Sequence, residues 1–155
     1  MQIRRFQNED AEAVSALIAL TMRTTNVKDY PLEMLEQAIA FLSPERLIER
    51  SSWMHSYVVC EGERIIGCGS VGPYWGKTDE SCLFTIFVDP SEQGRGIGRS
   101  IIETLEADEF FLRARRIEIP ASATAVGFYK KMGYDHKDGL AAQDDEGHYK
   151  MEKFR

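Results

Sequence analysis

Residues 94–98 read G-R-G-I-G, and they lie between the apolar stretch 83–88 and a helical pattern. The first N–H groups of a helix have no partner within it, and the helix dipole favours negative charge there. Glycines let an anion approach the backbone closely, and Arg95 and Arg99 add positive charge nearby. The segment therefore predicts an anion site, of the kind that binds a phosphate group.

Two familiar phosphate motifs fit this segment poorly. A P-loop requires a glycine followed by Lys and then Ser or Thr, and no such lysine is present. The dinucleotide fingerprint is G-x-G-x-x-G after a first strand, whereas this G-x-G-x-G follows the fourth predicted strand. The alternative is a tight strand-to-helix turn without a ligand, and the glycine spacing alone leaves both interpretations open.

A second segment, residues 125–134, reads A-V-G-F-Y-K-K-M-G-Y. Its apolar positions follow helical spacing, and Gly133 is placed to end the helix. Tyr129 lies four residues after Ala125 in this pattern. An aromatic residue at this spacing usually belongs to the core, and periodicity alone favours that interpretation.

Together the two segments resemble the GNAT N-acetyltransferase superfamily. Residues 93–98, Q-G-R-G-I-G, match its Q/R-x-x-G-x-G/A signature, and residues 125–134 match A-x-x-F-Y-x-x-x-G-F/Y. Residues 86–90 look like the family's fourth strand, and the spacing between the two segments also agrees. The diagnostic resemblance covers about residues 83–134, and it implies a GNAT-like fold with N-acetyltransferase activity.

The resemblance implies acetyl-CoA as cosubstrate. The amides of the glycine loop would hold its pyrophosphate, and the end of the preceding strand would pair through its backbone with the pantetheine arm. Backbone N–H groups of that strand would also stabilise the developing oxyanion. Tyr129 would be the general acid that protonates the departing thiolate. The cofactor-binding residues so implied are Ile86, Phe87, Val88, Gln93, Gly94, Arg95, Gly96, Ile97, Gly98, Arg99 and Ser122.

The general base stays open between two glutamates and ordered water. Some members of the family carry a glutamate early in the fourth strand, where this sequence has Cys82, and Glu80 lies two residues earlier on the same strand face. Other members use a glutamate on the fifth strand, which Glu118 would match. The other interpretation of Glu118 is a carboxylate at a solvated strand end. We consider Glu118 a possible base and Glu80 the runner-up.

Ser122 marks a second departure from the family pattern. Many members have an asparagine before the last helix that contacts the cofactor, whereas this chain has Ser122-Ala123-Thr124. We expect Ser122 to cap the helix first and to contact CoA only secondarily.

The elements that must position these residues follow the order β-αα-β-β-β-α-β-α-β-β. Asn8 is expected to cap the first helix and Ser43-Pro44 to start a short third one. Ile97, Ile101, Leu105 and Leu112 mark one amphipathic helix after the glycines. The order predicts an α/β (α+β) fold, a central mixed sheet with helices on both faces. Without a linker or repeat, residues 1–155 are expected to be a single domain.

The composition of the chain argues against several classes of function. The net charge of −6 argues against nucleic-acid binding. No apolar stretch approaches the roughly 18 residues that span a bilayer, and the N-terminus lacks the apolar segment of a signal peptide. Cys60, Cys68 and Cys82 lie in apolar strand-like stretches, so we expect buried, reduced thiols in a cytoplasmic protein. The scattered histidines predict no metal site.

The leading functional hypothesis is an N-acetyltransferase that moves an acetyl group from acetyl-CoA to a primary amine by direct attack in a ternary complex. A non-catalytic acyl-CoA-binding or regulatory module on the same fold is the alternative. The acceptor would be a small-molecule or peptide amine, bound near residues 24–30, Tyr74-Trp75 and the acidic residues 144–146. Either a monomer or a homodimer is compatible with the sequence.

Overall fold

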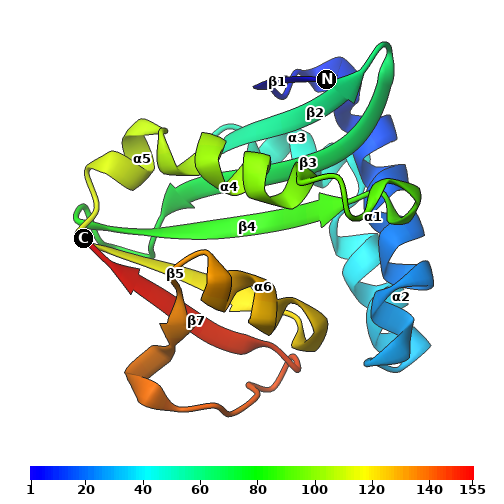
Figure 1. The fold of residues 1–155 in the computed structure, drawn as a ribbon. Helices are drawn as coiled ribbons and strands as arrows, with labels where there is room; N and C mark the ends of the chain where they lie inside the picture. Colours follow the sequence, from blue (N-terminus) through cyan, green and yellow to red (C-terminus); the bar gives the residue numbers. More distant parts are fainter.

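The computed structural model describes residues 1–155 and contains one seven-stranded sheet in the order β1-β2-β3-β4-β5-β7-β6 (Figure 1). Only β4 and β5 pair in parallel, and every other pair of neighbours is antiparallel. The strands are β1 (Gln2–Arg5), β2 (His55–Glu61), β3 (Arg64–Pro73), β4 (Glu80–Val88), β5 (Arg116–Ala121), β6 (Asp135–His136) and β7 (Tyr149–Phe154).

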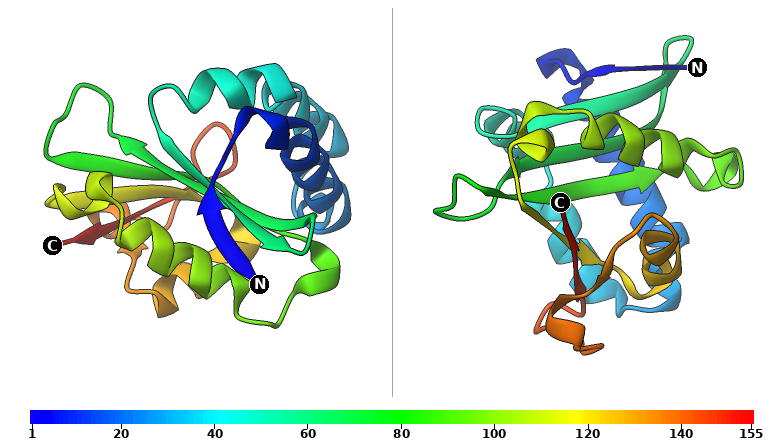
Figure 2. Two further views of the ribbon diagram at one scale, coloured as in Figure 1. Left: turned by 90° about the horizontal axis from the view of Figure 1, so that it is seen from above. Right: turned by 60° about the vertical axis from the view of Figure 1, so that its left-hand side comes forward.

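Helices cover both faces of this sheet (Figure 2). The N-terminal helices lie on one face and the later helices on the other, which confirms the predicted fold class. The short third helix expected at Ser43-Pro44 is present, and the structure adds a short fifth helix to the expected elements. The helices are α1 (Ala11–Thr24), α2 (Leu32–Phe41), α3 (Pro44–Arg50), α4 (Ile97–Glu106), α5 (Glu109–Leu112) and α6 (Val126–Lys131).

Each face of the sheet has its own apolar core. On one face, Ile97, Ile101 and Leu105 of α4 pack with strand residues such as Leu83 and Ile117. On the other face, the apolar side of α1 packs with α2, α3 and the first strands of the sheet. Burial of an aliphatic side chain contributes about 1.5–3 kcal/mol, so these two clusters hold the helices against the sheet that carries the site.

Two predicted helix starts have different outcomes. Gln7, not Asn8, is the N-cap at the first helical segment, and the Asp10 carboxylate accepts the Gln7 N–H at 2.8 Å. Asp10 also forms a 2.8 Å ion pair with Arg4. The carboxylate of Asp10, three residues after Gln7, therefore stabilises this turn. Ser43 caps α3 as predicted, because its hydroxyl accepts the Arg46 N–H at 3.3 Å.

The predicted single helix after the glycines is wrong beyond Glu106. The Asp108 carboxylate accepts the Phe110 N–H at 2.8 Å and so starts the separate helix α5. Leu112, expected on the apolar face, is therefore turned away from the core and is 53% exposed. An N-cap residue within the apolar pattern was the signal for this break.

The three cysteines are buried and unpaired, as predicted. Burial raises the pKa of the Cys68 thiol to about 12, and burial together with the nearby Glu118 carboxylate raises that of Cys82 further. Both side chains are therefore neutral thiols at physiological pH. None of the helices has the length and apolar character required to cross a lipid bilayer.

Candidate active site

The parallel strands β4 and β5 pair over only three positions. Glu80, Ser81 and Cys82 lie opposite residues 116–118, and no β4–β5 pairing continues beyond them. The two strands then diverge (Figure 1). From Leu83 onward the side of β4 that faces β5 has no partner strand, while β3 still pairs with its other side as far as Val88. This part of β4 offers backbone hydrogen-bonding groups to an extended ligand.

A bulge lies within this unpaired part of β4. The register with β3 shifts between Cys68 and Ser70, and Thr85 adopts a φ of 56°. A β-branched residue at positive φ is uncommon and strained, and nothing in the sequence at Thr85 indicates it. The bulge re-aims the backbone of the residues that follow, and the side chains from Phe84 to Val88 are all partly exposed.

The glycine loop joins the end of β4 to α4. Gly94 and Gly96 have φ values of 83° and 78°, and Gly96 is the N-cap of α4. No backbone N–H from residue 94 to residue 99 donates a hydrogen bond within the chain. A run of unpaired N–H groups at the start of a helix is the arrangement that binds phosphate, and the predicted anion site is therefore chemically suited to its ligand.

The three glycines and two arginines of this loop do not share one role. A side chain at Gly94 or Gly96 would meet no atom within 4 Å, so the positive φ is what requires glycine there. At Gly98 a Cβ would lie 3.2 Å from the Phe128 ring, so this glycine allows α4 to approach α6. Arg95 pairs with Glu61 at 2.8 Å and with Glu92, whereas Arg99 is exposed and unpaired.

Gln93 and Ser122 make contacts within the chain. The Gln93 side chain donates to the Val88 carbonyl at 3.3 Å and so braces the end of β4. Ser122 is the N-cap of a short 3-10 turn, but its hydroxyl does not cap a backbone N–H as expected. The Ala123 N–H instead donates to the Tyr30 hydroxyl at 2.9 Å, and the Ser122 hydroxyl lies 3.4 Å from that of Thr124.

Tyr129 lies in the core cluster of the α4–α6 face and is 6% exposed. Ile86 and Val88 of β4 pack against the same cluster, which puts the ring on the face from which the unpaired strand is reached. Its hydroxyl makes no hydrogen bond within the chain, and burial raises the pKa of the phenol well above its ordinary value. Tyr129 is thus a core residue that also holds an uncommitted proton.

The opposite face of β4, β5 and β7 carries a buried charged network. The Arg116 guanidinium donates to Glu80 at 3.0 Å, to Glu152 at 2.8 Å and to Glu118. Lys137 adds a 2.8 Å ion pair with Glu118. Burial alone would lower the pKa of Arg116, but these carboxylates raise it well above its ordinary value. Each charge in the network therefore has a partner, as buried charges require.

Glu118 is therefore not the lone charge on a strand that the sequence suggested. It is 4% exposed, so the solvated strand end is not where it lies. Alternation places Arg116 and Glu118 on one face of β5 and two isoleucines on the other. That spacing was the signal for the pair. Lys137 and Glu152 come from distant parts of the chain, and no sequence pattern indicated either contact.

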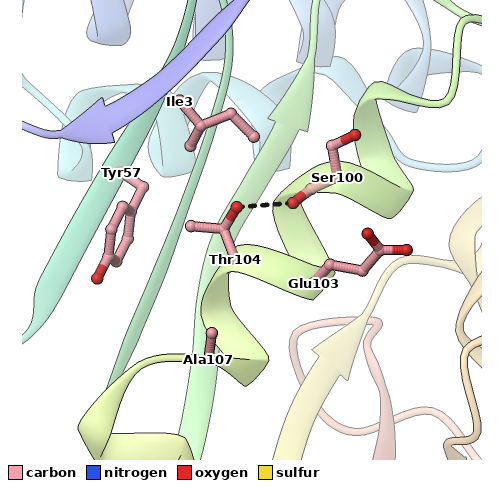
Figure 3. Close-up of a pocket in the computed structure, with 6 residues that line it drawn as sticks. All are labelled: Ile3, Tyr57, Ser100, Glu103, Thr104 and Ala107. Carbon is pink, nitrogen blue, oxygen red and sulfur yellow. Dashed lines mark hydrogen bonds between the residues drawn. The ribbon is translucent and has the colours of Figure 1, made fainter.

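A groove of about 520 Å³ lies elsewhere, between β1, β2 and α4 (Figure 3). The residues that line it are Ile3, Tyr57, Ser100, Glu103, Thr104 and Ala107. None of them belongs to the predicted site, and the strand order separates β1 and β2 from β5. The candidate site is therefore defined by the unpaired edge of β4 and not by this groove.

Solved structures with the same fold come from several organisms. The PaiA N-acetyltransferase of Thermoplasma acidophilum, in complex with coenzyme A, has a TM-score of 0.82 at 19% identity, covering 99% of this chain and 98% of that one. A GCN5-related N-acetyltransferase of Rhodopseudomonas palustris has a TM-score of 0.79 at 22% identity, covering 99% and 95%. An aminoglycoside 6′-N-acetyltransferase complexed with coenzyme A has a TM-score of 0.69 at 16% identity, covering 99% and 97%.

Sequence comparison agrees with the fold. No curated protein sequence matches the chain. The family model described as "Acetyltransferase (GNAT) family" matches residues 16–134, which include the glycine loop, the β4 edge and Tyr129. The chain therefore belongs to the GNAT acetyltransferase family, with acetyl-CoA as its cosubstrate.

Proposed function

We propose that this acetyltransferase moves the acetyl group of acetyl-CoA to a primary amine by direct attack in a ternary complex. The observation that carries the proposal is the separation of β4 from β5 after Cys82. It leaves an unpaired strand edge between a loop of free N–H groups, a buried phenol on one face and a charged network on the other. The thioester, the general acid and the amine would then come together in one complex, and no covalent enzyme intermediate would be required.

The glycine loop would hold the pyrophosphate. Its N–H groups from residue 94 to residue 99 are free to donate to phosphate oxygens, and Arg99 is available as a counter-charge. We assign Arg95 to this site through its backbone N–H, since its side chain is committed to Glu61 and Glu92. Gln93 would act indirectly, by bracing the carbonyl of Val88.

The unpaired edge of β4 would bind the pantetheine arm as a peptide adds to a sheet. The backbone groups of Ile86, Phe87 and Val88 would make these hydrogen bonds, while their side chains pack on the two cores. Backbone N–H groups here would also donate to the acetyl oxygen as it gains negative charge, the role of an oxyanion hole.

Tyr129 would donate a proton to the sulfur atom of the departing thiolate. The raised pKa keeps the phenol protonated at neutral pH, and its hydroxyl has no competing partner in the chain. Both properties support an acid that must hold its proton until the thioester bond breaks.

The base would act from the opposite face, where the amine enters. Glu118 is our first candidate and Glu80 the second, and both carboxylates are ion-paired with Arg116. Either group would have to give up one of these contacts to accept a proton, or take it through water. The acidic residues 144–146 would attract a cationic amine less strongly than these glutamates, since Asp144 accepts the N–H groups of Glu146 and His148.

Release of free thiol from acetyl-CoA in the presence of a broad amine panel tests the proposed function. Amino acids, polyamines, aminoglycosides and peptides should be included. The protein's own thiols are buried and should give a low background. We expect amine-dependent thiol release with at least one class. Tight CoA binding without thiol release above background across the panel would contradict the proposal and favour a non-catalytic acyl-CoA-binding module.

A further inference from the structure

Arg50, the last residue of α3, has no carboxylate within ion-pair distance. Four other arginines also lack such a partner, namely Arg5, Arg99, Arg113 and Arg155, and all four are exposed. Arg50 alone among the unpaired arginines is partly buried. Burial lowers the pKa of its guanidinium, and neighbouring Arg46 lowers it too. A cation taken out of water without a counter-ion is unfavourable unless a ligand supplies one.

Aromatic rings surround the Arg50 guanidinium. It lies 5.6 Å from the ring centre of Phe84, 5.9 Å from that of Trp53 and 5.8 Å from that of Phe41. Phe41 and Trp53 remain 51% and 42% exposed. Rings at these distances attract a cation but supply no counter-charge, so the guanidinium N–H groups stay available for a planar, bidentate partner. Its one hydrogen bond is long, 3.4 Å to the Thr85 hydroxyl.

The position of Arg50 relates it to the acceptor. Phe84 and Thr85 belong to the part of β4 that has left β5, and Thr85 directly precedes the proposed pantetheine-binding residues. Alternation puts Phe84 on the same face as Glu80, which is the proposed amine side. The cavity beneath Arg50 has a volume of only about 20 Å³, room for one water, so a ligand must reach the guanidinium from the side of the exposed rings.

The charges on this face show why the missing partner is an anion. The glutamates Glu80, Glu118 and Glu152 are all paired with Arg116, and Lys137 and Arg115 add two more cations. Arg115 also pairs with Asp79 at 2.7 Å, so the network holds four carboxylates and three cations, and none of these carboxylates pairs with Arg50. Cys82, which lies nearby, is a neutral thiol. The Arg50 guanidinium thus has no carboxylate of its own beside the proposed acceptor site.

We propose that the acceptor is a primary amine that carries a carboxylate, as a free amino acid does, and that Arg50 binds this carboxylate. This inference rests on the proposed function and names its substrate class. In an amino acid the amine and the carboxylate are close together. This suits a site in which Arg50 lies next to the unpaired edge of β4. Apolar or aromatic side chains would be favoured, because the exposed rings of Phe41 and Trp53 flank the guanidinium.

The test compares each L-amino acid with its own carboxamide, which has similar size and no charge. The wild-type protein, Arg50→Gln, Arg50→Lys and the control Arg46→Gln are assayed for kcat/KM by thiol release. Arg46 lies one turn earlier on α3, is exposed and contacts the Phe41 ring at 4.8 Å. Circular dichroism and Tm establish that each variant is folded.

We expect Arg50→Gln to lower the ratio of kcat/KM for the acid to that for the amide about 10- to 100-fold, the equivalent of one charge-assisted contact. The amines of an amino acid and of its amide differ in basicity. Because this difference is the same for wild type and variant, it cancels when their two ratios are compared. Arg50→Lys should restore part of the ratio, and Arg46→Gln should leave it unchanged. An unchanged ratio in Arg50→Gln would overturn the proposal.

A binding measurement separates this proposal from the proposed function. N-acetyl amino acids are titrated into the protein saturated with CoA, and tryptophan fluorescence reports on Trp53 and Trp75, whose rings both lie 5.9 Å from that of Phe84. Saturable quenching that weakens at least tenfold in Arg50→Gln supports the carboxylate site even if no amine is acetylated, in which case only the proposed function fails. Quenching that is absent, or that is equal in both proteins, counts against the carboxylate site whatever the activity.

Discussion

Where β4 separates from β5, the two faces of the sheet carry different kinds of chemical groups. On the α4–α6 face the site consists of backbone groups and one buried phenol within an apolar cluster. On the α1–α3 face it consists of paired charges around Arg116 and of Arg50 among aromatic rings. The comparison suggests that the chemistry common to the family lies on the first face and the choice of acceptor on the second.

The largest effect should come from Tyr129→Phe, which tests the first face. The change removes a hydroxyl that has no partner in the chain, so stability should hardly change. Loss of a general acid should lower kcat about 10²- to 10⁴-fold while leaving acetyl-CoA affinity within a few-fold. Stopped-flow thiol release and calorimetric CoA binding measure the two quantities.

Tyr134→Phe is the matched control for this change. Tyr134 is buried in the same cluster, but its hydroxyl is committed to Glu106, to which it donates at 3.2 Å. We expect near wild-type turnover from it. Unchanged turnover in Tyr129→Phe across pH, with chemistry still limiting CoA release, would show that Tyr129 is not the acid.

Arg116→Gln tests the second face through stability. Removal of the central cation leaves three buried carboxylates without it, and breaking a buried ion pair costs about 3–5 kcal/mol. Urea unfolding at neutral pH should report a loss of this size. A loss below about 1 kcal/mol would mean that the carboxylates reorganise or reach water.

The same variant should alter the pH dependence of stability. Burial alone would raise the pKa of Glu152, but the Asp138 N–H and Arg116 hold it below its usual range. A depressed pKa contributes stability above the unfolded-state value, about 4.3 for Glu, that is lost as pH falls through the folded-state value. The difference between wild type and Arg116→Gln should therefore narrow below about pH 4. A difference that widens there would contradict this assignment.

Gly96→Ala should have a smaller effect, confined to the cofactor side. An alanine at φ 78° is strained by about 1–2 kcal/mol and would relax by turning N–H groups away from the pyrophosphate. We expect the KM for acetyl-CoA to rise about tenfold. Gly62→Ala carries a similar strain, at φ 63° with no atom near its Cβ, in the turn between β2 and β3. Equal KM values in the two variants would exclude the glycine loop as the pyrophosphate site.

The smallest effect concerns the thiols. Cys60, Cys68 and Cys82 should not react with a thiol reagent in the native protein and should all react in urea. Absorbance titration counts them. A thiol that reacts rapidly in the folded state would show that the sheet opens locally beside it.

The sequence predicted the first face better than the second for a physical reason. Glycine spacing, the Phe-Tyr motif and helical periodicity are local patterns. They correctly identified the glycine loop as the start of a helix and Tyr129 as a residue of the core. The close approach of Gly98 to Phe128 was not predicted, because it joins two helices that lie far apart in the sequence. The bulge at Thr85 has no local signature at all.

The second face depends on contacts between distant segments. Glu118 attracted notice as a charge between isoleucines, and strand alternation places Arg116 beside it. Its partner Lys137 becomes apparent only when β5 and the residues after β6 come together. Arg50 gave no signal in the sequence, because an arginine at the end of a helix is ordinary there. Only the absence of a carboxylate around it, which is a property of the folded chain, sets it apart.

The unpaired edge of β4 has a consequence for solubility. Exposed strand edges invite pairing with other molecules and lead to aggregation. This edge lies in the middle of the sheet, with β5 beside its first residues and α6 near its end, and not at the rim (Figure 1). A slender, flexible chain can lie along it, whereas another protein's strand would bring neighbouring strands that cannot fit. The fold thus keeps a permanent hydrogen-bonding edge for a small ligand while shielding it from self-association.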